Sequence, residues 1–237
     1  MLQRLDKLIS SQGTLSRSRV KALIRDGAVR INGVTAVSPE QRADADVDEI
    51  TVNGRVLTYS RYVYIMLNKP AGVVSASSDS RVETVVDLVP GELKRRGLFP
   101  AGRLDRDTTG FVLITDDGEF AHRILSPANH IPKTYEARLA VRLGTDEAEL
   151  VSSGITLADG TVCMPADVRV LEDTDTPLVR ISICEGRYHQ IKRMFAAAGN
   201  FVTALKRTAM GALELDGSLK EGECRLLSKN EVELITK

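Results

Sequence analysis

The chain has 237 residues, 43% of them hydrophobic, and its 32 basic side chains balance 32 acidic ones. It contains no run near the roughly 20 consecutive apolar residues that a membrane helix needs, and its start, MLQRLDKLIS, is too charged for a secretory signal. These features argue against a membrane or secreted protein and predict a soluble cytoplasmic protein with one large domain, or one domain plus a small module.

The first 33 residues concentrate positive charge, with seven basic side chains against two acidic ones. Apolar residues at helical spacing predict one helix around RLDKLIS and a second within SRSRVKALIRDG, where Ser16 is the expected N-cap and Gly27 the expected stop. VRINGVTA and ITVNGRVL each place Asn-Gly between short apolar runs, the pattern of a tight hairpin. We therefore predict a compact module that ends near Leu57.

The second predicted helix carries a basic stripe. Arg17, Lys21 and Arg25 recur every four residues and therefore lie on one face of the helix. Such a face can be merely solvated, but the local excess of charge in a neutral chain favours contact with phosphates.

RLDKLIS, LSRSRVKALIRDGAVRINGV and ADVDEITVNG together resemble the S4 RNA-binding module over roughly the first quarter of the chain. The resemblance implies a structured RNA as partner and no particular reaction. The expected RNA contacts of this module are Arg4, Ser16, Arg17, Lys21, Arg25 and Arg30.

Beyond the linker TYSRY the pattern changes to longer strands, expected at YVYIML, FVLIT, TYEARLAVRL, LVRISI and EVELIT. Helices are expected at EFAHRIL, DEAELVSS and RYHQIKRMFAAAG. Strand-rich runs without regular βα alternation predict an α+β fold with a mixed, mainly antiparallel sheet. We expect a small module over residues 1–60, built of two helices and short hairpins, and a catalytic domain over residues 61–237.

Motifs for common cofactors are missing from the sequence. It has no G-x-G-x-x-G, P-loop or G-x-S-x-G, and its three histidines and three cysteines lack the spacing of metal ligands. We therefore expect no cofactor and no metal, which leaves the carboxylates as candidates for chemistry.

The turn AGRLDRDTTG sets Asp105 between Arg103 and Arg106 in a glycine-bracketed loop, directly before the apolar run FVLIT. A carboxylate held there, with cations that favour its ionised form, is suited to act as a nucleophile or a base. An aspartate in a turn also commonly bonds the local backbone, so from the turn alone both interpretations stay open.

A second candidate segment, residues 185–207, contains five basic residues from Arg187 to Arg207 and no acid after Glu185. If a helix begins near Tyr188, its apolar residues face a core and its polar residues share the other side. That other side would present His189, Lys192 and Arg193 for a phosphate or a carboxylate.

In a third segment, PKTYEARL, Tyr135 follows Lys133 at a strand start, where an aromatic ring serves either as core or as a surface for stacking a base.

These segments, with YIMLNKPAGVV, resemble the RsuA-type pseudouridine synthases over nearly the whole chain. The joint occurrence and order of G-R-L-D, K-T-Y and G-R-Y-H-Q-I-K-R-M-F is specific to that family. The resemblance implies the pseudouridine synthase fold, no cofactor, and a reaction that detaches uracil from its ribose at N1 and rejoins it through C5. It leaves open whether the carboxylate attacks C6, attacks C1′ or assists a glycal route.

The resemblance also implies a role for particular residues. Asp105 corresponds to the catalytic aspartate, and Lys192 to a basic residue that pairs with it. Tyr135 and Ile191 are expected on either side of the flipped uracil, and Tyr135 could also assist proton movement. Arg103 is expected near the vacated base stack or the RNA backbone. The remaining expected substrate contacts are Lys133, Arg187, His189, Gln190 and Arg193.

For the substrate, the resemblance favours a uridine in 16S rRNA, free or in a partly assembled small ribosomal subunit, and a monomeric enzyme. Large-subunit enzymes often carry long basic C-terminal extensions, whereas this chain stops at SKNEVELITK. The same chemistry on 23S rRNA, a non-catalytic assembly factor and a structural ribosomal protein are the alternatives; the neutral charge argues against the last.

Overall fold

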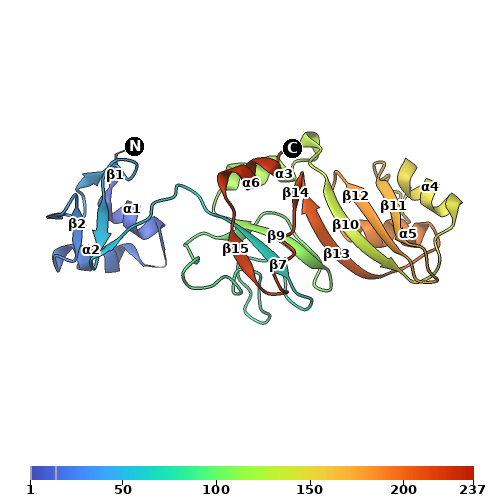
Figure 1. The fold of residues 1–237 in the computed structure, drawn as a ribbon, viewed down its shortest axis with the longest axis horizontal. Coiled ribbons are helices and arrows are strands. Elements are labelled where there is room, and N and C mark those ends of the chain that lie inside the picture. The colour runs from blue at the N-terminus through green and yellow to red at the C-terminus, as the bar shows by residue number, and fades with distance from the viewer. Residues whose placement is uncertain (1, 14) are drawn as a thin grey trace. The chain divides into compact units, whose positions relative to one another are not determined.

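The structure is a computed structural model that describes residues 2–13 and 15–237 (Figure 1). The chain forms two compact units. One comprises the residues up to Val63 together with Pro90–Leu98, and the other comprises Tyr64–Val89 together with Phe99–Lys237. None of the helices in the described stretches combines the length and hydropathy that a membrane crossing requires.

The first unit contains two helices and two small sheets. Its elements are β1 (Gln3–Arg4), α1 (Leu5–Ser11), α2 (Arg17–Arg25), β2 (Val29–Ile31), β3 (Val34–Thr35), β4 (Arg42–Ala43), β5 (Ile50–Val52) and β6 (Arg55–Val56). β1 pairs with β4, and the other strands form a sheet in the order β3-β2-β5-β6.

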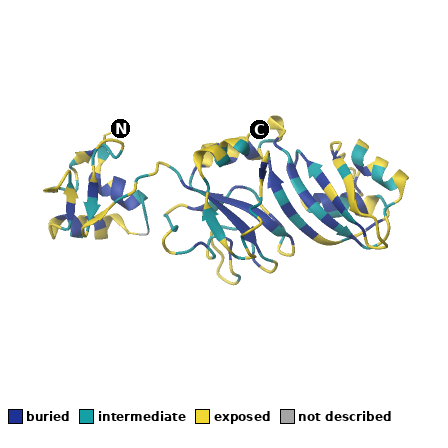
Figure 2. Ribbon diagram, viewed as in Figure 1, coloured by how far each residue is buried: buried dark blue, intermediate teal, exposed yellow. Residues whose placement is uncertain are grey.

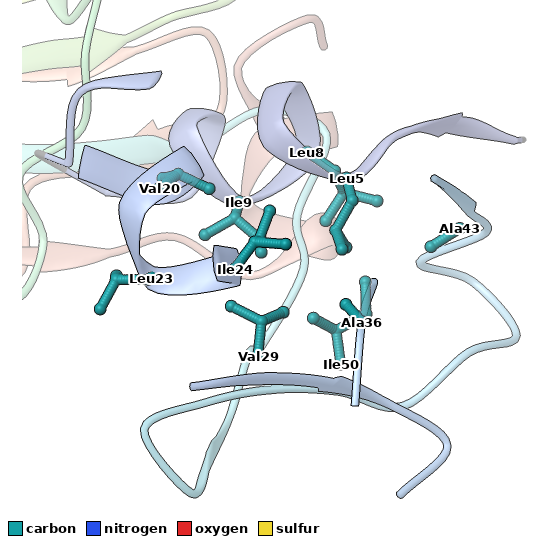
Figure 3. Close-up of a cluster of buried hydrophobic side chains, with 10 residues drawn as sticks. All are labelled: Leu5, Leu8, Ile9, Val20, Leu23, Ile24, Val29, Ala36, Ala43 and Ile50. Atoms are coloured by element: carbon teal, nitrogen blue, oxygen red, sulfur yellow. The ribbon is translucent and has the colours of Figure 1, made fainter. Parts of the chain in front are cut away.

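Local signals account for the boundaries in this unit. The Ser16 hydroxyl accepts a hydrogen bond from the Arg19 N–H at the start of α2, and Gly27 follows the helix with φ +71°, as predicted. Both Asn-Gly pairs adopt positive φ at both residues, as a tight primed hairpin turn requires. The core that joins the helices to the sheet includes Leu5, Leu8, Ile9, Val20, Leu23, Ile24, Val29 and Ile50 (Figure 3).

The second unit is built on one large sheet. Its strands are β7 (Tyr64–Lys69), β8 (Phe99–Pro100), β9 (Thr109–Thr115), β10 (Lys133–Leu139), β11 (Asp167–Glu172), β12 (Leu178–Ile183), β13 (Val202–Met210), β14 (Leu213–Glu214) and β15 (Cys224–Leu226). Its helices are α3 (Gly118–Leu125), the 3₁₀ turn η1 (Pro127–Asn129), α4 (Thr145–Ser153), α5 (Gln190–Ala197) and α6 (Lys229–Leu234).

The strands run in the order β11-β12-β10-β13-β9-β7-β15, with β14 beside β13 and β8 beside β9 (Figure 1). β9 and β13 are parallel, whereas the other ladder pairs of this sheet are antiparallel. The mixed sheet confirms the predicted α+β class. Burial alternates along β10 (Figure 2). Lys133 and Tyr135 therefore share its buried face, while Thr134 and Glu136 lie on the other face.

Three expectations about the elements were wrong. The segment EVELIT is not a strand: its first four residues lie in α6 and the last two follow the end of that helix, because Ser228 and Glu231 form a capping box whose side chains bond each other's backbone N–H groups. The helix expected from Tyr188 begins at Gln190, since His189 adopts a left-handed backbone with φ 48°. The strand expected over residues 134–143 ends at Leu139, and β13, beside it in the sheet, was not predicted.

Candidate active site

Asp105 lies in the loop between β8 and β9, and hydrogen bonds hold the backbone on both sides of it. The Ser75 hydroxyl donates to the Leu104 carbonyl (3.1 Å) and accepts from the Leu104 N–H (3.0 Å). On the other side, the Gly72 N–H donates to the Arg106 carbonyl at 2.8 Å. The loop therefore presents its carboxylate from a rigid backbone.

Lys69, at the end of β7, ties this loop to the sheet. Its fully buried ammonium donates to the carbonyl oxygens of Pro70 (2.9 Å), Arg106 (3.2 Å) and Thr108 (2.8 Å). Burial lowers the pKa of Lys69 from 10.5 to about 8, against the opposing effect of nearby carboxylates. Sequence reasoning assigned Lys69 no role, although a lysine that closes an apolar strand is an unusual buried residue.

Gly110 allows β13 to pack directly against the end of this loop. Its φ is +97°, and a Cβ placed there would lie 2.2 Å from the backbone oxygen of Arg207. Only glycine accommodates both the backbone conformation and this close approach. The contact places Arg207 beside the Asp105 loop.

Lys192, on α5, reaches two aspartates of the loop. Its ammonium lies 2.6 and 2.8 Å from the carboxylate oxygens of Asp107 and 3.7 Å from Oδ2 of Asp105. The hydrogen bond from Lys192 lowers the pKa of Asp107. Asp105 also lies 3.4 Å from Nε2 of His189, so two nitrogen groups face the carboxylate expected to be catalytic.

The segment before α5 is organised by Glu185, which sequence reasoning did not single out. Its buried carboxylate accepts hydrogen bonds from the Met164 N–H (2.9 Å), Nε2 of Gln190 (2.6 Å) and Nε of Arg187 (2.9 Å). On α5 itself Ile191 is buried, as predicted. Lys192 stays partly exposed, with 24% of its side chain accessible.

Two adjoining hollows meet at Asp105. One is a groove of about 760 Å³ and the other a cavity of about 70 Å³. The residues that line both are Arg103, Leu104, Asp105, Tyr135, Gly186, Arg187 and His189. Asp105 thus stands where a wide groove narrows into a small pocket.

Most of the expected substrate residues gather here. Gln190 and Ile191 line the small cavity and Lys133 lines the groove, while Tyr135, only 8% exposed, lines both. Within the described chain, Arg193 lies outside both linings, and its guanidinium pairs with Asp159 at 2.5 Å. Tyr188 and Arg207 also line the groove. Arg207 ends the basic segment expected to contact phosphates, whereas Tyr188 was assigned no role.

In the first unit, the predicted stripe of α2 faces solvent, with Arg17, Lys21 and Arg25 exposed opposite the buried residues of that helix. Arg30 is exposed as well. Arg4 instead forms ion pairs with Asp6 and Glu40, each at 3.0 Å, so its charge is already matched within the unit.

Comparison with known proteins assigns both parts of the chain. The family described as RNA pseudouridylate synthase matches residues 63–197, and the S4 domain matches residues 3–48. The uncharacterized RNA pseudouridine synthase YtzG of Bacillus subtilis is 44% identical over 98% of each chain. The ribosomal small subunit pseudouridine synthase A of Haemophilus influenzae is 42% identical over 99% of this chain and 100% of its own.

Among solved structures, one described as a crystal structure of pseudouridylate synthase is 41% identical, with a TM-score of 0.68. The match covers 98% of this chain and 99% of the other.

Proposed function

Because this chain belongs to the RNA pseudouridylate synthase family and is a pseudouridine synthase with an S4 domain, we propose that it isomerises one uridine of 16S rRNA, with Asp105 as the catalytic carboxylate. The single observation that carries the assignment of Asp105 is its position at the junction of the two hollows, on a loop bonded on both sides.

The chemistry needs few groups from the protein. The N1–C1′ bond breaks, the uracil turns, a C5–C1′ bond forms, and a proton leaves C5 while N1 gains one. Whether Asp105 attacks C6, attacks C1′ or assists a glycal route, it must be ionised and oriented. Nζ of Lys192 and Nε2 of His189, at 3.7 and 3.4 Å from its carboxylate oxygens, lie where they can orient it.

The small cavity is suited to an extruded base. Tyr135 and Ile191 both line it, so an aromatic ring and an aliphatic side chain can cover a planar ring beside Asp105. Confinement of a base between such groups contributes roughly 1–3 kcal/mol of stacking free energy. We assign Arg103, which is exposed at the mouth, to the strand from which the base is extruded.

Extrusion costs a few kcal/mol of unstacking, which contacts to the RNA backbone must offset. We assign those contacts to Arg187 beside the groove and to the exposed stripe of Arg17, Lys21 and Arg25 in an S4 module over residues 1–60. The catalytic domain then spans residues 61–237, and we propose that the enzyme works as a monomer in the cytoplasm.

The name of the Haemophilus influenzae relative supports the small subunit as the source of the substrate, as free rRNA or a partly assembled particle. The test is pseudouridine mapping, by carbodiimide modification and primer extension, on rRNA from cells that lack this protein. One 16S uridine should lose its modification and regain it with wild type but not with Asp105→Asn. A lost site in 23S rRNA would contradict the substrate assignment, and no lost site would favour a binding factor without catalysis.

Asp107→Asn is the matched control, because Asp107 is a second aspartate of the same turn. Its carboxylate lies closer to the Lys192 ammonium than that of Asp105, at 2.6 Å against 3.7 Å. If Asp105 is the catalytic group, this variant keeps measurable activity while Asp105→Asn has none. Full activity of Asp105→Asn would refute the assignment.

Tyr135→Phe separates two roles of the tyrosine, because it keeps the ring and removes the hydroxyl. Activity near that of wild type would assign stacking alone. A loss of about 100-fold or more in kcat would assign a proton transfer.

A further inference from the structure

Two buried cations line the groove beside Asp105. Lys133 is 6% exposed and Arg207 is 3% exposed. They lie on the adjacent strands β10 and β13, where Arg207 is in register with Tyr135, two residues from Lys133. Both line the 760 Å³ groove.

Neither cation has an anionic partner among the described residues. Nε of Arg207 donates to the Phe111 carbonyl at 2.7 Å, but its buried Nη2 has no hydrogen-bond partner. Among the described residues Lys133 has no ion pair, and its Nζ is not one of the buried atoms that lack a partner, so the tip of this largely buried side chain faces the groove. Burial, and then the charge of Arg207, lower the pKa of Lys133.

The carboxylates of the groove are engaged elsewhere. Glu185 accepts three hydrogen bonds from other donors, and Asp105 faces Lys192 and His189. Leaving a buried charged group without a partner is costly, and Arg207 has such an atom in Nη2. With Lys133 beside it in the same groove, this indicates that an anion from outside completes the pair.

We propose that Lys133 and Arg207 form a binding site for one phosphate of the RNA strand, within the groove and adjacent to the flipped uridine. This proposal rests on the proposed function, because it takes the bound strand to be the substrate RNA. The ring of Tyr135 lies 6.0 Å from the Arg207 guanidinium carbon, so a base on Tyr135 and a phosphate on Arg207 would be close neighbours along the strand. A guanidinium with a free Nη2 and an ammonium together match the oxygens of a phosphate.

Lys133→Met tests the site, since it removes the charge and keeps the length of the side chain. Binding of a labelled 16S rRNA transcript, followed over a salt series, should weaken roughly 10-fold. The salt slope, which is the slope of the logarithm of the RNA-binding constant against the logarithm of the salt concentration, should fall in magnitude by about 0.7–0.9, the value for one phosphate contact. Lys133→Arg should restore both, and Lys220→Met, which removes an exposed lysine outside the groove, should change neither.

Thermal stability provides a second readout that a structural role would not reproduce. Because the charge of Lys133 is uncompensated in the free protein, Lys133→Met should raise the Tm by about 2–4 °C. Inorganic phosphate, compared with chloride at equal ionic strength, should raise the Tm of wild type more than that of Lys133→Met. A lower Tm together with an unchanged salt slope would overturn the proposal.

These measurements distinguish a phosphate of the RNA strand from free inorganic phosphate as the occupant of the site. If inorganic phosphate stabilises wild type selectively while RNA affinity and salt slope are the same in wild type and Lys133→Met, the site binds free phosphate and the assignment to RNA is overturned. Binding and stability need no turnover. A transcript that wild type binds but does not modify therefore refutes the proposed function without removing the phosphate site.

Discussion

Lys69→Met should loosen the Asp105 loop and lower the stability of the second unit. The change removes three hydrogen bonds from a fully buried ammonium to the carbonyl oxygens of Pro70, Arg106 and Thr108. Each hydrogen bond to a charged group contributes about 1.5–3 kcal/mol, offset by the several kcal/mol that burial of the charge costs. We therefore expect a net loss of about 2–4 kcal/mol and a Tm lower by roughly 5–15 °C, measured by calorimetry.

The pH dependence of this loss follows from the lowered pKa of Lys69. Between pH 8 and 10.5 the unfolded chain still holds a proton at Lys69 that the folded protein has released. Unfolding therefore takes up a proton there, and the stability of wild type relative to Lys69→Met rises with pH by about 3 kcal/mol across the window. A Tm difference that stays constant or shrinks from pH 7 to pH 10 would refute this reasoning.

Catalysis supplies an independent check on the same variant. Because Lys69 holds backbone on both sides of Asp107 and close to Asp105, its loss should displace the carboxylate. A displacement of about 1 Å can cost about 100-fold in rate. Single-turnover rates at a temperature where both proteins stay folded should show that loss, and an unchanged rate would mean that Lys69 supports the fold alone.

Three further outcomes are expected. Gly110→Ala should fail to fold or lose several kcal/mol, seen as insoluble protein or a strongly reduced Tm, because its Cβ would meet the backbone of β13 at 2.2 Å; a normal Tm would contradict this. Glu185→Gln should cost about 1–3 kcal/mol in a denaturant titration and raise KM, since one charged acceptor serves three donors; an unchanged KM would show that the segment does not need the charge. Replacing Arg17, Lys21 and Arg25 together with Gln should reduce the salt slope of RNA binding by about 2–3 with no change in Tm, because all three are exposed; an unchanged slope would leave the stripe as a merely solvated face.

Much of the local structure was readable in the chain because its signals are local. Asn-Gly pairs specify both hairpins through two consecutive positive φ angles, and Ser16 marks the start of α2 through a single hydrogen bond. EVELIT was misread because alternating apolar residues also suit a strand. The capping box of Ser228 and Glu231 decides for a helix.

The residues expected to act on the substrate were proposed from their type and order, and most of them line the two hollows at Asp105. Of the described residues expected there, Lys192 and Arg193 line neither hollow. Lys192 reaches Asp105 and Asp107 from α5, whereas the pairing of Arg193 with Asp159 depends on where the loop of residues 154–162 lies in the fold. The backbone of His189 was equally hidden. Its left-handed conformation starts α5 two residues later than the apolar spacing suggested.

The sequence by itself determined the α+β class, the S4-like and synthase-like segments, and the turn that carries Asp105. Only the tertiary structure decided which groups support that turn. Lys69 contacts carbonyls 37 and 39 residues away, and the Nε of Arg207 contacts one 96 residues away, across neighbouring strands. Periodicity and capping act over a few residues, whereas the environment of a buried charge depends on which strands pair. Here the backbone of β13 reaches the Asp105 loop only because Gly110 has no Cβ to block its approach.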